Sequence, residues 1–190
     1  MMMKVWTLAL VLVLSACSSS SNTQKTYYQL PVMADTSTTQ TAVSQGRPLW
    51  VEHVSVADYL VNTGLVYQTN DVQYVIASNN LWASPLDQQL QQALVANLGH
   101  KLPGWVVTTQ PQGSEQAVLN VSVTGFHGRY DGNVVVRGEW MLTYQGKVLK
   151  RPFSVLLPQT EDGYDTLVRT LAQGWQQVSQ SIAQQASTLN

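Results

Sequence analysis

The chain has 190 residues and a formal net charge of −1, and only 11% of its residues are charged although 44% are hydrophobic. A typical soluble domain carries about 25% charged residues, so this surface must be built from Gln, Ser, Thr and Asn. The length predicts one ordinary domain, and the near-neutral charge excludes a basic footprint for nucleic acid. A single cysteine excludes an intramolecular disulfide and a metal cluster of cysteines.

The N-terminus has the layout of an export signal. Lys4 precedes an apolar run at residues 5–14, which fits the core of a secretory signal and is too short for the about 20 residues that span a bilayer. The sequence LSAC at residues 14–17 then resembles the bacterial lipobox, which implies that the Cys17 sulfur is acylated and that the chain is cut before it. An ordinary signal peptide with an accidental cysteine is the alternative.

Three segments follow from this pattern. We expect a lipoprotein signal peptide at residues 1–16, a flexible tether at residues 17–26 and one domain at residues 27–190. The tether contains SSSSNTQKT, which has no apolar residue. Ser18 directly after the cysteine implies, again by resemblance to lipoproteins, export to the outer membrane.

The first half of the domain predicts short strands and one helix. Strands are expected at residues 27–31, 49–56, 61–67 and 72–76, and residues 34–47 form a polar loop that is either functional or mobile. Ser84 as N-cap and Pro85 at the first position then begin a helix, which Gly99 ends. Leu81 and Trp82 precede this helix and are expected to hold the incoming chain on the core.

The second half predicts an antiparallel meander and a long helix. A strand at residues 105–109 is followed by strands at 118–126, 134–144 and 147–157, with a tight turn at Gln145-Gly146. From about Asp162, an apolar stripe repeats at helical spacing, and its members are Tyr164, Leu167, Val168, Leu171, Trp175, Val178 and Ile182. The predicted fold class is therefore α+β: a single domain with a mostly antiparallel sheet and two main amphipathic helices packed on it.

The candidate chemical residues do not form a catalytic or metal-binding pattern. His53, His100 and His127 lack metal-ligand spacing, and no G-x-S-x-G motif marks a nucleophile, so we expect no metal, no cofactor and no enzyme. The stretch GFHGRYDG at residues 125–132 predicts an irregular hairpin loop. Because binding residues favour loops, four of its residues are candidates for partner contact: His127, Arg129, Tyr130 and Asp131.

Both predicted helices carry many glutamines on their polar surfaces. These are Gln88, Gln89, Gln91 and Gln92 on the first helix, and Gln173, Gln176, Gln177, Gln180, Gln184 and Gln185 on the second. Uncharged polar faces suit protein contacts because they lose water more cheaply than charged faces. An ordinary solvated face is the alternative interpretation.

The order of these segments resembles a known family. The lipobox, YYQLP, WVEHVSVADYL, LWASPLDQQLQQALVANL, the strand series containing WMLTY and the long final helix together resemble the ABC-type transport auxiliary lipoproteins, in particular their paraquat-inducible branch. This resemblance implies a non-enzymatic protein, anchored in the outer membrane through Cys17 and facing the periplasm. It also implies docking of an MCE-domain protein that bridges the membranes in lipid transport, and a possible homo-oligomeric ring. A lipid-binding carrier and a cell-envelope hydrolase are the alternative functions.

Overall fold

The computed structural model describes residues 24–32 and 46–188. Cys17, the predicted signal peptide, most of the predicted tether and most of the 34–47 loop lie outside the described residues. The helices and strands are β1 (Thr26–Tyr28), β2 (Arg47–Val56), the 3₁₀ helix η1 (Asp58–Leu60), β3 (Gly64–Gln68), β4 (Tyr74–Trp82), α2 (Leu86–Lys101), β5 (Trp105–Thr108), β6 (Ala117–Arg129), β7 (Asn133–Tyr144), β8 (Lys147–Pro158) and α3 (Tyr164–Ala186).

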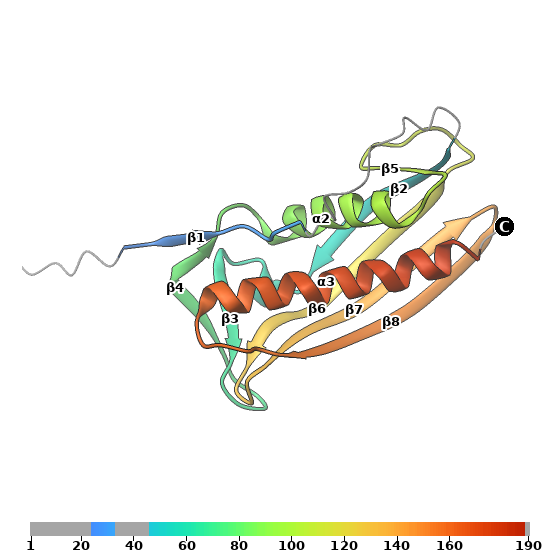
Figure 1. The fold of residues 1–190 in the computed structure, drawn as a ribbon. Coiled ribbons are helices and arrows are strands. Elements are labelled where there is room, and N and C mark those ends of the chain that lie inside the picture. Colours follow the sequence, from blue (N-terminus) through green and yellow to red (C-terminus); the bar gives the residue numbers. More distant parts are fainter. Residues whose placement is uncertain (1–23, 33–45, 189–190) are drawn as a thin grey trace, which may run out of the picture.

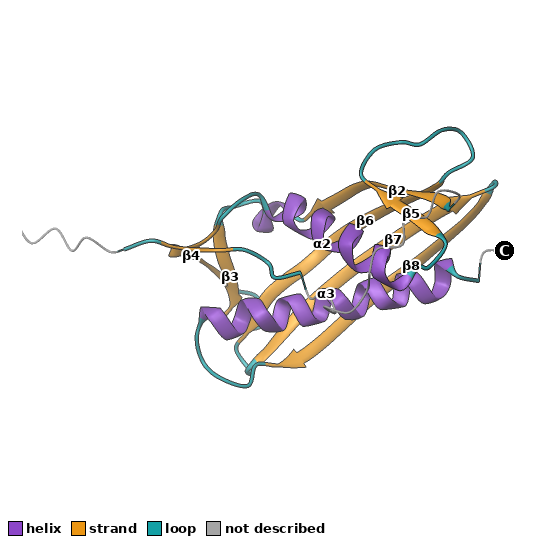
Figure 2. Ribbon diagram, turned by 45° about the horizontal axis from the view of Figure 1, so that its top comes forward, coloured by secondary structure: helices purple, strands orange, loops and turns teal. Residues whose placement is uncertain are grey.

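The predicted α+β class is confirmed: eight strands form one mixed sheet, and α2 and α3 cover one of its faces (Figures 1 and 2). The predicted meander is present, since β6, β7 and β8 pair antiparallel in sequence order. The N-terminal strands join the sheet differently. β2 pairs in parallel with the first part of β6, and β3 pairs in parallel with its last residues, on the same edge. The sheet is therefore antiparallel on the β7 side of β6 and parallel on the other side.

The central strand β6 keeps the predicted alternation but is longer than predicted. Leu119 and Val121 are buried toward the helices, and a register shift follows between Val123 and Gly125. Such a bulge inserts one residue and changes which side chains face the core. Phe126 is therefore buried as well, with its ring 6.4 Å from that of Trp175 in α3.

The core lies between the helices and the covered face of the sheet. The predicted apolar stripe of α3 is confirmed, because Leu171, Trp175 and Ile182 are each at most 1% exposed. The indole of Trp175 donates a hydrogen bond of 3.0 Å to the carbonyl of Leu90 in α2. This bond joins the two helices over the sheet, so α3 packs against both layers.

The ends of α2 differ from the prediction. The N-cap is Pro85 and no side-chain cap bond forms there, so the predicted capping role of Ser84 is wrong. The helix also continues through Gly99 to Lys101, and the chain turns at Gly104, whose φ is +86°. Glycine tolerates this left-handed conformation without a steric penalty, which explains why the turn falls there. Leu81 and Trp82, predicted to precede the helix and hold the chain on the core, are the last two residues of β4 and are at most 9% exposed.

Two glutamines of α2 have structural roles that the sequence did not indicate. Gln89 is 3% exposed; its side chain accepts a hydrogen bond from the backbone N–H of Leu30 and donates one to the carbonyl of Ser84. Gln91 donates to the carbonyl of Val51 in β2. The glutamine surface predicted for α2 is therefore partly an internal network, which fastens the N-terminal segment and β2 to the helix.

Candidate functional site

The candidate residues at the end of β6 lie at one end of the sheet, where β6 turns into β7. Because successive side chains of a strand point to opposite faces, and Phe126 contacts the helices, His127 points to the face that the helices leave open. His127 is nevertheless only 3% exposed. It forms a small second core with Tyr59 and Tyr74, whose rings lie 6.3 and 5.1 Å from the imidazole.

The His127 cluster, which we define as His127, Tyr59 and Tyr74, is held together by ring packing. Burial favours the neutral forms of His127 and Tyr59, although the hydrogen bond of His127 acts on its pKa in the opposite direction. The Nδ1–H of His127 donates to the carbonyl of Gly128 at 3.0 Å, and burial lowers the pKa of the imidazole, with the cations of Arg137 and Arg129 acting in the same direction. Burial, with the neighbouring Tyr74, raises the pKa of Tyr59 to about 12. His127 and Tyr59 are therefore uncharged at neutral pH.

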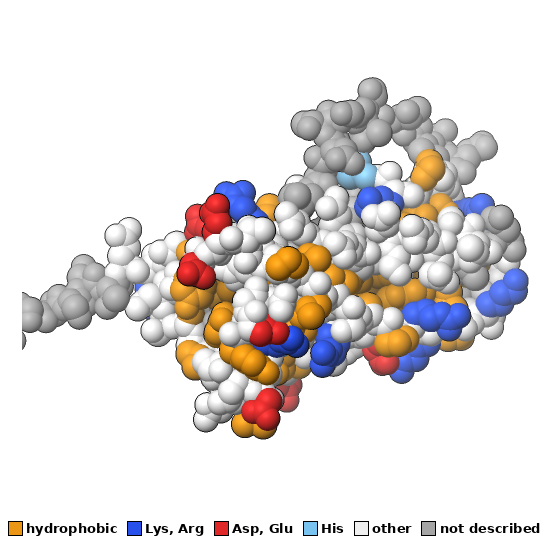
Figure 3. All heavy atoms as spheres, turned by 60° about the horizontal axis from the view of Figure 1, so that its bottom comes forward, with side chains coloured by type: hydrophobic (Ala, Val, Ile, Leu, Met, Phe, Trp, Pro, Cys, Tyr) orange, Lys and Arg blue, Asp and Glu red, His pale blue; other side chains and the backbone are white. Residues whose placement is uncertain are grey.

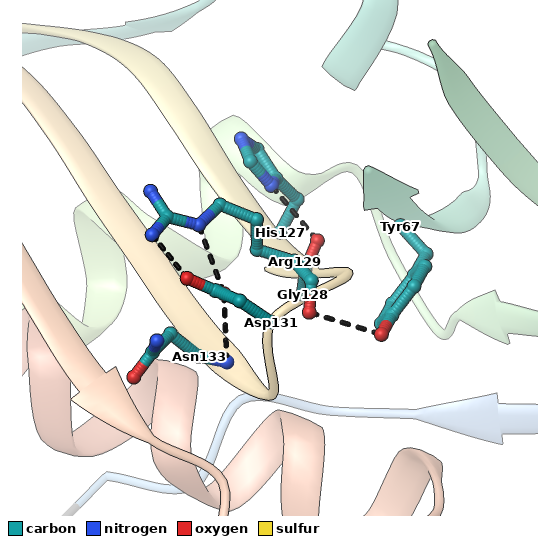
Figure 4. Close-up of polar contacts among 6 residues, drawn as sticks. All are labelled: Tyr67, His127, Gly128, Arg129, Asp131 and Asn133. Atoms are coloured by element: carbon teal, nitrogen blue, oxygen red, sulfur yellow. Dashed lines mark hydrogen bonds and ion pairs between the residues drawn. The ribbon is translucent and has the colours of Figure 1, made fainter. Parts of the chain in front are cut away.

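The turn that follows is polar and internally paired (Figure 4). The guanidinium of Arg129 forms an ion pair and two hydrogen bonds with the carboxylate of Asp131. The Arg129 hydrogen bonds, together with donation from the backbone N–H of Asn133, hold the pKa of Asp131 well below its usual range. The hydroxyl of Tyr67 in β3 donates to the carbonyl of Arg129 at 2.9 Å. These contacts fix the backbone on both sides of Tyr130.

The prediction of an irregular loop at residues 125–132 is wrong. β6 extends to Arg129, since its ladder with β7 continues to Gly128 and its ladder with β3 includes Arg129. The structure therefore separates the four candidate residues. His127 is buried, Arg129 and Asp131 neutralise each other, and the ring of Tyr130 is 53% exposed at the turn. Tyr59 and Tyr74 were missed, because they come from distant segments that only the fold brings to His127.

The described residues contain no group of three or more His, Cys, Asp or Glu side chains that could hold a metal ion. A hollow of about 560 Å³ lies on the open face of the sheet, and Arg137, Glu139 and Thr124 are among its lining residues. The space under the helices is filled instead by side chains such as Trp140, which is 2% exposed. Within residues 24–32 and 46–188, no helix is long and apolar enough to cross a membrane.

The fold and the full chain both match known proteins. Residues 28–183 match the family of the ABC-type transport auxiliary lipoprotein component. The chain belongs to this family, which confirms the resemblance seen in the sequence.

The relatives within the family are more specific. The chain is 57% identical over 188 residues to the "Intermembrane transport lipoprotein PqiC" of Escherichia coli K12, covering 98% of this chain and all of the relative, and equally to that of Shigella flexneri. A crystal structure of an uncharacterized protein is 60% identical and aligns with a TM-score of 0.78, covering 86% of this chain and 99% of the other. A protein of Xanthomonas campestris, 19% identical, shares the fold with a TM-score of 0.62 and coverage of 87% and 100%.

Proposed function

We propose that this protein is a lipoprotein of the outer membrane that docks the far end of an MCE-domain, membrane-bridging protein and so assists lipid transport between the two membranes. Acyl chains on Cys17 would anchor it, with the domain facing the periplasm. The similarity to intermembrane transport lipoproteins over nearly the whole chain carries this proposal. The lipobox-like LSAC at residues 14–17 supports the anchor.

The proposed mechanism is anchoring and recognition. Two or more acyl chains hold a protein at a membrane far more firmly than one chain does. Confinement to a thin layer raises the effective concentration of the domain for a partner that reaches that layer. No catalytic step is needed, which agrees with relatives named as transport lipoproteins.

We place the partner contact at the β6–β7 turn, where Tyr130 and Asp131 are exposed. Exposed tyrosines are common anchors of protein interfaces. Arg129 and His127 support this turn rather than contact the partner, because one is paired with Asp131 and the other is buried. The outer edge of β8, which pairs only with β7 among the described strands, is available for contact with a second copy in a ring.

The alternative of a lipid-binding carrier has less support. A carrier needs an apolar cavity that encloses much of its ligand. In the described residues, the apolar interior under the helices is packed with large side chains: Trp140, Trp175, Phe126 and Leu142 are at most 2% exposed. The hollow on the open face contains Arg137 and Glu139, whose charges disfavour acyl chains.

The replacement Cys17→Ala tests the proposed anchor. Cells that express the wild-type chain should incorporate labelled palmitate into it, and the chain should sediment with the outer membrane. The Cys17→Ala chain should lack the label, appear in the soluble fraction and fail to co-purify with MCE-domain proteins. Ser20→Ala in the tether is the matched control and should behave as wild type. Unchanged fractionation of Cys17→Ala would contradict the anchor.

A replacement at the turn tests the partner contact separately. Tyr130→Ser should reduce cross-linking to the MCE-domain protein without releasing the lipoprotein from the membrane, because the anchor is intact. Val148→Ser at the opposite end of the molecule, where the side chain is 62% exposed, is the control. Equal cross-linking of the two variants would remove the turn from the proposed interface.

A further inference from the structure

The β3–β4 tip, which we define as residues 69–76, exposes an unusual concentration of apolar side chains. Val72, Tyr74, Val75 and Ile76 are 77%, 44%, 54% and 43% exposed. They are four of the twelve large hydrophobic side chains that are exposed in the described part of the chain. Since Tyr74 and Val75 are neighbours in a strand, they point to opposite faces of the hairpin. Val72 and Val75 are therefore apolar and uncovered, whereas the half-exposed Tyr74 also packs against Tyr59 and His127, with ring centroids 4.9 and 5.1 Å apart.

The backbone of this tip is satisfied internally. The side-chain oxygen of Asn70 accepts hydrogen bonds from the backbone N–H groups of Val72 and Gln73 at 3.0 and 2.9 Å. The backbone N–H of Thr69 donates to the carbonyl of Gln73 at 2.9 Å. Burying a polar group is costly only when it has no hydrogen-bond partner. The turn can therefore lose water at low cost while it presents Val72 outward.

The tip lies at the end of the molecule from which the chain leaves β1, and the β7–β8 turn and the C-terminus lie at the other end (Figures 1 and 2). β1 is parallel to β4 and pairs with Asn80, Leu81 and Trp82, so the chain before Thr26 leaves in the direction from which β4 comes. The ladder of β4 with β3 is irregular between Ile76 and Leu81, so Tyr74 and Asn80 are separated by less than the roughly 20 Å of six residues in a regular strand. Residues 17–23 span at most roughly 25 Å, which allows Cys17 and the tip to reach one plane.

The charges near the tip indicate what kind of surface it fits. The segment 69–76 contains one acidic residue, Asp71, and no Lys or Arg. Figure 3 shows hydrophobic side chains at this end of the molecule, together with acidic ones and some Lys and Arg, and more Lys and Arg toward the other end, where β8 begins. Lys147, Lys150 and Arg151 belong to that strand. An electrostatic contact with anionic lipid is thus disfavoured at the tip, and tyrosine beside aliphatic residues suits the boundary between water and acyl chains.

We propose that the β3–β4 tip inserts into the surface of a zwitterionic lipid bilayer and orients the domain on the membrane that anchors it. The inference rests on the proposed function in taking Cys17 as the anchored end. The acyl chains provide the affinity, and the tip limits rotation about the tether. The β6–β7 turn, which pairs with β3 through Arg129, is thereby held beside the lipid surface.

Hydrogen exchange on vesicles tests this proposal without depending on acylation in cells. The full mature chain, beginning at Cys17, is coupled through its single thiol to a maleimide lipid in vesicles of phosphatidylcholine and phosphatidylethanolamine. The reference is the same chain in solution with the thiol capped. Amides of residues 69–76 should exchange at least threefold more slowly on the vesicles, and those of residues 145–148 should be unchanged.

Two variants sharpen the outcome. Val72→Ser combined with Ile76→Ser should abolish the slowing at the tip, because it removes the apolar contact, whereas Val148→Ser should not. The slowing should also persist at 0.5 M salt, where the electrostatic screening length is only about 4 Å, because the proposed contact is apolar. Equal exchange at the tip on vesicles and in solution would overturn the proposal. Equal slowing at residues 69–76 and at residues 145–148 would also overturn it. Loss of palmitate labelling in cells would refute the anchor but leave this measurement unaffected.

Discussion

Replacement of Trp175 tests the account of the core most directly. The indole is 1% exposed, contacts the rings of Phe126 and Phe153, and donates to the carbonyl of Leu90. Large-to-small replacement of a buried Trp costs about 3–5 kcal/mol, and loss of the indole hydrogen bond adds about 1 kcal/mol. We therefore expect Trp175→Ala to lower the free energy of unfolding by about 4–6 kcal/mol. Trp175→Phe, which keeps most of the volume, should cost about 1–2 kcal/mol.

Urea unfolding, followed by far-ultraviolet circular dichroism, measures these differences in the mature chain carrying Cys17→Ala. With a slope of about 2 kcal/mol per molar urea, the midpoint for Trp175→Ala should fall by about 2–3 M. Val148→Ala, at an exposed position, should leave the midpoint unchanged. A shift below about 0.5 M for Trp175→Ala would refute the reasoning, because it would mean that α3 does not hold α2 and the sheet together through this residue.

Four further replacements test particular contacts. Gly138→Ala should destabilise the fold by at least about 2 kcal/mol, because the added Cβ would lie 2.6 Å from the Phe153 ring. Gly99→Ala should stabilise the fold by about 0.5–1 kcal/mol, because no atom lies within 4 Å of the added Cβ. Equal urea midpoints for the two variants would contradict this. The free energy of unfolding should fall as the pH drops below 6.5, the pKa of His127 in the unfolded chain, because the folded pKa is lower and the unfolded chain binds the proton first. His127→Leu should flatten this pH dependence. An unchanged slope for this variant in pH-dependent thermal unfolding would contradict the role of His127. Gln89→Met, which removes the hydrogen bond from Leu30 of the N-terminal segment and the one to the carbonyl of Ser84, should cost about 1–3 kcal/mol and speed proteolysis before β2. Resistance equal to wild type would contradict that role.

The sequence predicted best those elements whose pattern is local and long. The stripe of α3 and the strand predicted at residues 134–144 were correct, because a helix or strand of that length must bury one face. The turn at Gln145-Gly146 was also correct, and both residues have the positive φ angles, +49° and +75°, that a two-residue hairpin of this type needs.

Predictions failed where the reason for a conformation lies elsewhere in the chain. Residues 125–132 contain three glycines and suggested a loop, yet β6 continues to Arg129 because β3 and β7 supply hydrogen-bond partners on both edges. Gly128 lies in that strand because a Cβ there would come within 2.6 Å of the Tyr67 ring. The same composition can serve a loop or a crowded strand, and only the neighbours distinguish the two.

The amino-acid sequence by itself determined the family, the α+β class, the long helix and the cysteine proposed for lipid attachment, because each depends on residue order or on periodicity within one segment. The tertiary structure decided which polar residues are internal, such as Gln89 and His127, and which apolar ones are exposed together, as in the β3–β4 tip. Burial depends on residues that are far apart along the chain. Tyr59, Tyr74 and His127 meet only after β3, β4 and β6 have paired, and no local pattern records that contact.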